Sequence, residues 1–134
     1  MSARTAFLSK LIGIYCILIS LAMVAHRQAT VEAMTALLHN PPLVFVVGVM
    51  AVAVGLAMVL GHNVWSGGGL PITVTLIGWS SLFKGVLLLF LSPEAVSVFF
   101  LAGLHYEQLF DFYAAVALVL GIYLTYGGIR ATER

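Results

Sequence analysis

Residues 70–91, LPITVTLIGWSSLFKGVLLLFL, decide the fold of this chain. The stretch is 22 residues long, and an apolar helix needs about 20 residues to cross a bilayer. Lys84 is its one charged residue, and a lysine at membrane depth costs free energy even when its ammonium group reaches toward the lipid headgroups. Some other group must offset that cost, so Lys84 is the first candidate for a functional residue.

The composition extends this interpretation to the whole chain. Of its 134 residues, 62% are hydrophobic and 8% are charged, whereas a soluble domain carries about 25% charged residues. So few charges cannot cover a surface in water, which predicts an all-α integral membrane protein with one domain, residues 1–134. The net charge of +1 argues against a nucleic-acid partner, and the single cysteine, Cys16, excludes an internal disulfide.

Four stretches have the length and hydropathy of membrane spans: residues 7–25, 43–60, 70–91 and 112–129. Arg4 and Lys10 precede the first apolar core, as they would in a signal peptide. Cleavage after Ala25 would require a small residue at the −3 position, where this chain has Met23. We therefore expect the first helix to remain as a signal anchor.

The basic residues predict the orientation of these spans. If both termini are cytoplasmic, the cytoplasmic side carries four of them, Arg4, Lys10, Arg130 and Arg134, and the outer side carries Arg27 alone. Lysine and arginine accumulate on the cytoplasmic side of membrane proteins. The sequence therefore predicts that both termini are cytoplasmic.

The two outer connections each predict a short helix. Residues 26–42 place Val31, Met34, Leu37 and Leu38 at helical spacing before two prolines. The second connection opens with Ser92–Pro93–Glu94, which favours a helix start, and the apolar run after it is too short to span. The expected fold is a four-helix bundle with two short interfacial helices on the outer side.

Small residues recur in every span at positions x, x+3 and x+7. The sets are Gly13/Cys16/Ser20, Gly48/Ala51/Gly55, Gly78/Ser81/Gly85 and Ala114/Ala117/Gly121. In lipid the hydrophobic effect does not drive helices together, whereas small residues allow close contact between backbones. We therefore predict that Gly13, Gly48, Gly55, Gly78, Gly85 and Gly121 serve helix packing.

A polar stripe runs along the third span, because Thr73, Ser80 and Lys84 fall on one side at 100° per residue. The lysine is open to three interpretations: a structural ion pair or snorkelling residue, a site for an anion, proton or lipid phosphate, and a contact with another subunit. The candidate ion-pair partners on the outer side are Asp111 first, then Glu107 and Glu94.

Three histidines, His26, His39 and His105, are expected near the outer interface, and Glu107 and Asp111 follow the last of them. Imidazoles and carboxylates together bind zinc and similar ions. No His-x-x-x-His spacing supports such a site, so these residues are weak metal candidates, with ordinary interfacial histidines as the alternative. The sequence identifies no cofactor.

The connection between the second and third spans, residues 62–69, is HNVWSGGG. His62, Asn63 and Trp65 are its candidate functional residues. The small residues of this loop allow its backbone amides to form an anion-binding nest, which could bind a lipid headgroup. A flexible turn that lets two helices pack as a hairpin is the alternative.

Residues 60–93, with HNVW, LP, GW and KG among them, resemble an uncharacterised family of small four-helix bacterial inner-membrane proteins. The resemblance implies four helices and a bacterial inner membrane, and it implies no activity. No catalytic triad, carboxylate pair or nucleotide-binding motif occurs in the sequence, so we do not expect an enzyme.

Two functions follow as hypotheses. The first is a non-enzymatic accessory or scaffold subunit of a larger inner-membrane assembly. The alternative is a homo-oligomeric channel or carrier, with Thr73, Ser80 and Lys84 lining the path. The expected partners are membrane lipids, and either other membrane protein subunits or further copies of this chain.

Overall fold

The computed structural model describes residues 2–103, 105 and 108–133, and all of its regular structure is helical. The elements are α1 (Ala3–Ala25), α2 (Arg27–Leu38), α3 (Pro41–Gly61), α4 (Gly69–Phe90), α5 (Pro93–Ser97), the π-helical turn η1 (Val98–Gly103) and α6 (Phe110–Glu133). Helices α1, α3, α4 and α6 are long and apolar enough to cross a membrane. The predicted all-α fold, with four membrane-length helices and two short ones, is confirmed.

Side-chain caps set the starts of three helices. The hydroxyl of Ser2 accepts a hydrogen bond from the amide of Thr5 at 3.2 Å, at the start of α1. Asn40 caps α3 in the same way and is followed by Pro41. Ser92 caps α5 through the amide of Ala95 at 3.2 Å. Each cap satisfies an amide that the first turn of a helix leaves without a partner.

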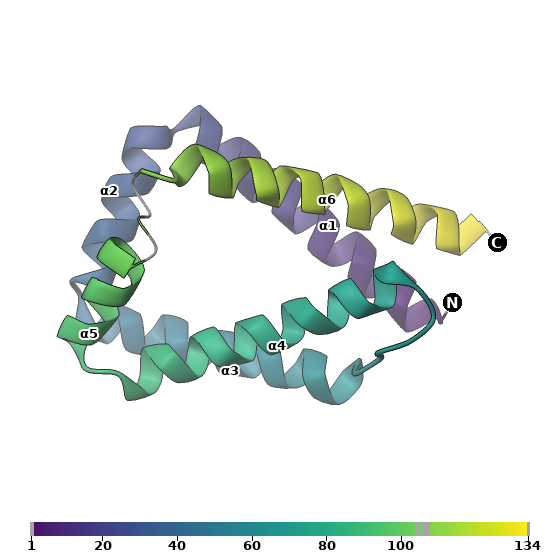
Figure 1. Ribbon diagram of the computed structural model, residues 1–134, viewed down its shortest axis with the longest axis horizontal. Coiled ribbons are helices and arrows are strands. Elements are labelled where there is room, and N and C mark those ends of the chain that lie inside the picture. The colour runs from purple at the N-terminus through teal and green to yellow at the C-terminus, as the bar shows by residue number, and fades with distance from the viewer. Residues whose placement is uncertain (1, 104, 106–107, 134) are drawn as a thin grey trace.

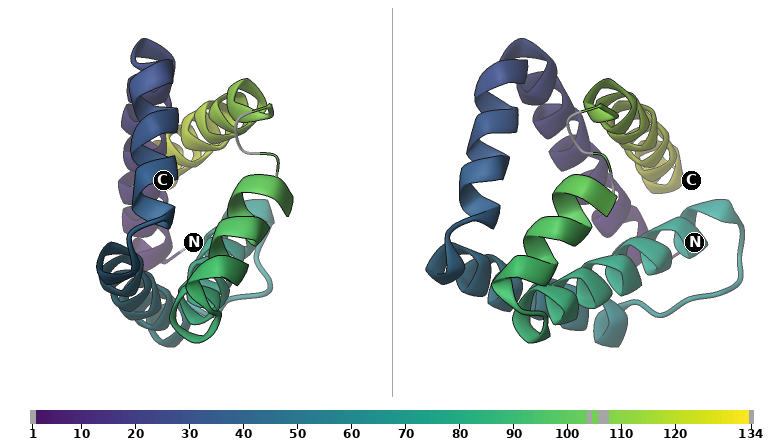
Figure 2. Two further views of the ribbon diagram at one scale, coloured as in Figure 1. Left: turned by 90° about the vertical axis from the view of Figure 1, so that its left-hand side faces the viewer. Right: turned by 60° about the vertical axis from the view of Figure 1, so that its left-hand side comes forward.

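The four long helices pack as two pairs, α1 with α6 and α3 with α4. Figure 1 shows the pairs close together at the end that holds both chain termini and spread apart at the other end, where α2 and α5 lie. Figure 2 looks at that second end, with α2 and α5 in front of the long helices. We call these the terminal end and the capped end.

Glycines lie where the two helices of a pair approach each other most closely. A methyl group added to Gly121 of α6 would lie 2.8 Å from the carbonyl oxygen of Gly13 in α1. One added to Gly85 of α4 would lie 2.6 Å from the amide nitrogen of Val52 in α3, and one added to Gly55 would overlap the backbone of Leu82. The backbones of each pair are therefore close enough to exclude a side chain at these positions.

Two apolar clusters hold the two ends of the molecule. At the terminal end, the buried residues Met58, Leu70, Val74 and Leu124 join α3, α4 and α6. At the capped end, the buried residues Leu38, Val44, Leu88 and Val96 fix α2 and α5 against α3 and α4. The second cluster is one wall of the cavity described next.

Candidate functional site

Lys84 lines a cavity of about 300 Å³ at the capped end. Five elements contribute to its wall: α2, α3, α4, η1 and α6. The other lining residues are Met34, Leu37, Leu38, Val47, Leu88, Phe100 and Tyr113. The wall is therefore apolar apart from the Lys84 ammonium group and the Tyr113 phenol.

No described residue forms a hydrogen bond or an ion pair with the Lys84 ammonium group. The side chain is exposed at the cavity. Within a membrane, a charge without a partner is costly, and such residues face a bundle interior, a water-filled cavity or a binding site. No described side chain therefore offsets the cost of Lys84.

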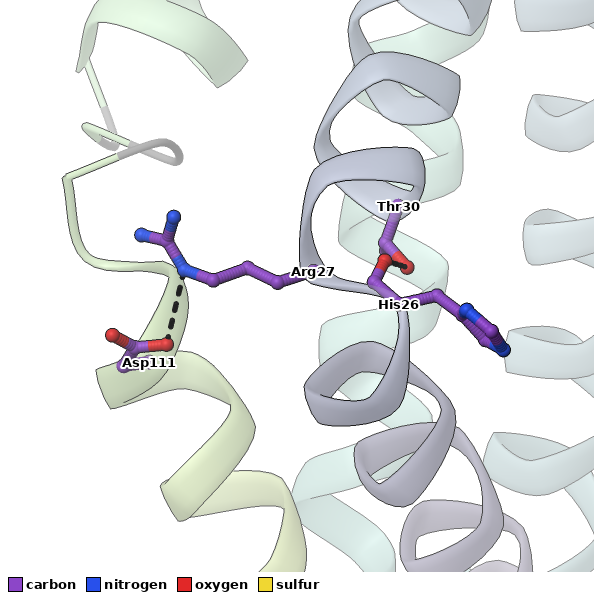
Figure 3. A network of polar contacts seen from close by, with 4 residues as sticks. All are labelled: His26, Arg27, Thr30 and Asp111. Carbon is purple, nitrogen blue, oxygen red and sulfur yellow. Dashed lines mark hydrogen bonds and ion pairs between the residues drawn. The ribbon is translucent and has the colours of Figure 1, made fainter.

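Asp111 forms its ion pair with Arg27, so the expected pair with Lys84 is not formed. The Arg27 Nε donates to the Asp111 Oδ1 at 3.2 Å (Figure 3), and the Arg27 guanidinium also lies over the Phe110 ring at 5.4 Å. Arg27 is the first residue of α2, two residues after the end of α1. Because α1 packs against α6, Arg27 lies beside the start of α6. Glu94 is exposed at the start of α5 and forms no ion pair with Lys84, while Glu107 lies outside the described residues.

The other two residues of the polar stripe do not line the Lys84 cavity. The Thr73 hydroxyl donates to the carbonyl oxygen of Gly69 at 2.7 Å, one turn earlier in the same helix. Ser80 is exposed on α4. Of the stripe, Lys84 alone reaches the cavity.

The terminal end holds a second polar site around the candidate residue His62, whose partners Thr5 and Thr75 the sequence did not identify. His62 is buried, with 3% of its surface exposed. Its Nε2 lies 2.8 Å from the Thr5 hydroxyl of α1, and its Nδ1 lies 3.3 Å from the Thr75 hydroxyl of α4. This imidazole therefore links the α1–α6 pair to the α3–α4 pair.

The donors and acceptors around His62 assign its protons. The Thr75 hydroxyl accepts from the amide of Val64 and donates its single proton toward the carbonyl oxygens of Val64 and Pro71, at 2.9 and 3.0 Å. It therefore accepts from Nδ1–H, and Nε2 accepts from the Thr5 hydroxyl. Every polar atom of the His62 ring is satisfied within the chain.

The residues after His62 are also ordered by hydrogen bonds. The Asn63 Oδ1 accepts from the indole N–H of Trp65 at 2.7 Å and from that of Trp79 at 3.3 Å. The second bond gives the mid-span Trp79 a polar partner. Gly67 and Gly68 adopt φ values of 90° and 111°, which other residues rarely adopt. Because the amide of Val64 is already bonded to Thr75, it does not contribute to an anion-binding nest.

The structure does not bring the three metal candidates together. The ring of His26 points away from Arg27 and Asp111 (Figure 3). His39 contacts Ser97 at 3.2 Å and its own helix at the Thr35 carbonyl oxygen, while His105 lies in the α5–α6 connection. Among residues 2–103, 105 and 108–133, no group of three or more His, Cys, Asp or Glu side chains is placed to hold a metal ion.

An apolar groove runs along one face of α6. It is lined by Phe112, Ala115, Val116, Val119, Leu120 and Tyr123. Gly121 faces α1, because its nearest neighbours are Gly13 and Ile17. Val119 and Tyr123 stand two residues to either side of Gly121, and at 100° per residue they lie on the opposite side of the helix. The groove therefore faces away from α1.

The comparisons with known proteins give no further identification. No protein-family model matches the chain, and no curated protein or solved structure shows significant similarity to it. The structure supports a small multi-pass membrane protein with four span-length helices.

Proposed function

We propose that this protein is a non-enzymatic accessory or scaffold subunit of a larger assembly in the bacterial inner membrane. The proposal is that it docks a transmembrane helix of another protein along the groove of α6. The observation that carries it is the exposed stripe Phe112, Val116, Val119 and Tyr123.

The spacing of this stripe suits a second helix. Its members are separated by four, three and four residues, which is the 3.5-residue repeat of knobs-into-holes packing. Their exposed fractions run from 46% at Tyr123 to 68% at Val119. The groove also contains Ala115, which has a small side chain. Helices in lipid associate where small residues allow the backbones to approach closely.

The remaining surfaces support a structural role over catalysis. The glycine seams of all four long helices are used within the two pairs. Among the described residues that line the Lys84 cavity, only Lys84 and Tyr113 carry polar side-chain groups, and the rest of the lining is apolar.

We infer further that both termini are cytoplasmic. Arg4, Lys10 and Arg130 lie at the terminal end, and Arg27 lies at the capped end. This distribution follows the positive-inside rule. A reporter that is active only in the cytoplasm, fused after residue 134, is expected to be active. Activity only of a reporter that requires export would reverse the orientation.

Photo-crosslinking in the native membrane tests the docking face. A benzoylphenylalanine at Val119 is expected to give one protein adduct of defined mass. The matched control is the same probe at Leu18 of α1, which is 62% exposed and is expected to give no defined adduct. Equal behaviour of the two positions would contradict docking along α6.

The alternative is a homo-oligomeric channel or carrier. The exposure of Ser80 and Lys84 on the same stripe of α4 favours it. In that case the Val119 adduct, or an adduct from a probe at Ser80, has twice the mass of the chain. Proteoliposomes then show an ion flux that Lys84→Glu changes in selectivity.

A further inference from the structure

We propose that the Lys84 cavity binds a single-chain anionic amphiphile, whose carboxylate or phosphate pairs with the Lys84 ammonium group and whose hydrocarbon chain lies against the apolar wall. The site is distinct from the α6 groove, and the two proposals succeed or fail independently.

The charge of Lys84 selects the polar group of the ligand. No described residue neutralises its ammonium group, and the surrounding wall is apolar. In such surroundings the attraction between opposite charges is much stronger than in water. A carboxylate or phosphate oxygen supplies both the opposite charge and a charge-assisted hydrogen bond.

The rest of the wall selects the body of the ligand. The wall presents hydrocarbon surface from Leu37 and Leu88 and a thioether from Met34. Phe100 adds an aromatic ring. A small hydrated anion would lose its water against these side chains without any compensating hydrogen bonds. A hydrocarbon chain gains contacts there, and the flexible thioether of Met34 adapts to its shape.

The size of the cavity limits the number of chains. Its volume of about 300 Å³ is at the lower limit of pockets that bind small molecules, which hold roughly 300–1,000 Å³. That space suits part of one chain better than a two-chain lipid.

The depth of Lys84 also suits an amphiphile. It lies six residues before Phe90, the last residue of α4, which corresponds to about 9 Å along the helix axis. Lysine side chains reach toward the membrane surface from such depths. An acid group bound there lies close to the boundary between headgroups and acyl chains.

Binding of oleate to the full chain in a non-ionic detergent tests the proposal. The readouts are native mass spectrometry and displacement of a fluorescent fatty acid. We expect oleate to bind the wild type and Lys84→Arg. Lys84→Met should weaken binding by about tenfold or more, because it removes a charge-assisted bond. Lys10→Met is the matched control and should bind oleate as the wild type does, because Lys10 contacts Thr132 at the other end.

Two further probes separate charge from chain. Methyl oleate has the same chain without the charge and is expected to bind weakly to every variant. Leu88→Trp fills the cavity while keeping Lys84, and it is expected to abolish oleate binding. The unfolding midpoint of each variant shows that it is folded.

Four results would overturn the proposal. The first is oleate binding by Lys84→Met at wild-type affinity, and the second is equal binding of oleate and methyl oleate. The third is displacement of the probe by phosphatidylglycerol but not by oleate, which would assign the site to a two-chain lipid. Inorganic phosphate that displaces the probe as well as oleate does would likewise remove the hydrocarbon part of the proposal.

Discussion

His62 at the terminal end and Lys84 at the capped end differ in whether their polar groups have partners within the described chain. At the terminal end, His62 is buried and both ring nitrogens have partners from other helices. At the capped end, Lys84 lines a hollow, and no described residue bonds to its ammonium group. The imidazole of His62 therefore stabilises contacts between the helix pairs, whereas the described residues leave the ammonium group of Lys84 without a partner.

The difference has a physical basis in what surrounds each group. An imidazole can be fully satisfied by two hydroxyl groups, so His62 joins the two helix pairs at little desolvation cost. An ammonium group needs an anion, and the nearest candidate from the sequence, Asp111, is already paired with Arg27. Substitutions at the two ends should therefore change the free energy of unfolding by different amounts.

The largest effect is expected where the α3–α4 pair is closest, because both ends depend on that pair. In Gly55→Leu the new side chain would overlap the backbone of Leu82. Overpacking of this kind should lower the free energy of unfolding by about 3 kcal/mol. Gly61→Leu is the matched control, because a Cβ atom there meets nothing within 4 Å. Equal unfolding free energies for the two variants in detergent would show that the helices are not in close contact at Gly55.

The next largest effect is expected at the terminal end. Thr5→Val and His62→Ala each break the same hydrogen bond, and each should cost about 1–2 kcal/mol of unfolding free energy. In a double-mutant cycle the double variant should therefore be less destabilised than the sum of the two. His26→Ala, which removes an exposed ring, serves as the control. Strict additivity would mean that Thr5 and His62 are not bonded.

The smallest effect is expected for the ion pair at the capped end. The side chains of Arg27 and Asp111 are 49% and 81% exposed, and solvent-exposed pairs contribute about 0.2–1 kcal/mol. Asp111→Asn should therefore lower the unfolding free energy by less than about 1 kcal/mol, and added salt should reduce the difference. If Asp111→Asn lowered the unfolding free energy as much as His62→Ala does, the ion pair would stabilise the capped end as strongly as His62 stabilises the terminal end. That result would contradict the difference between the two ends.

The sequence predicts the helices well because hydropathy and capping are local properties. Each predicted span coincides with one long helix of the structure, and none extends more than one residue beyond the end of its helix. The predicted spans are residues 7–25, 43–60, 70–91 and 112–129. The start at Ser92–Pro93 was also predicted, because the cap and the proline stand together in the sequence. Length, hydropathy and caps therefore suffice for the elements.

The pairing of the helices and the two sites depend on contacts that the sequence does not encode locally. All four spans carry the same small-residue spacing, so the pattern does not tell which helix packs with which. Thr5 and His62 are 57 residues apart, and no spacing rule connects them. Arg27 entered the sequence reasoning only as a charge for the orientation, because its position beside Asp111 follows from the packing of α1 on α6.

The polar groups of His62 are satisfied by Thr5 and Thr75, whereas no described residue pairs with the ammonium group of Lys84. The most direct test compares the unfolding free energies of Lys84→Met and His62→Ala with that of the wild type, in one detergent without added lipid. We expect a loss of about 1–2 kcal/mol for His62→Ala and no loss, or a gain, for Lys84→Met, because this substitution removes a costly unpaired charge. A loss for Lys84→Met as large as that for His62→Ala would show that Lys84 is paired within the chain, and it would contradict the account.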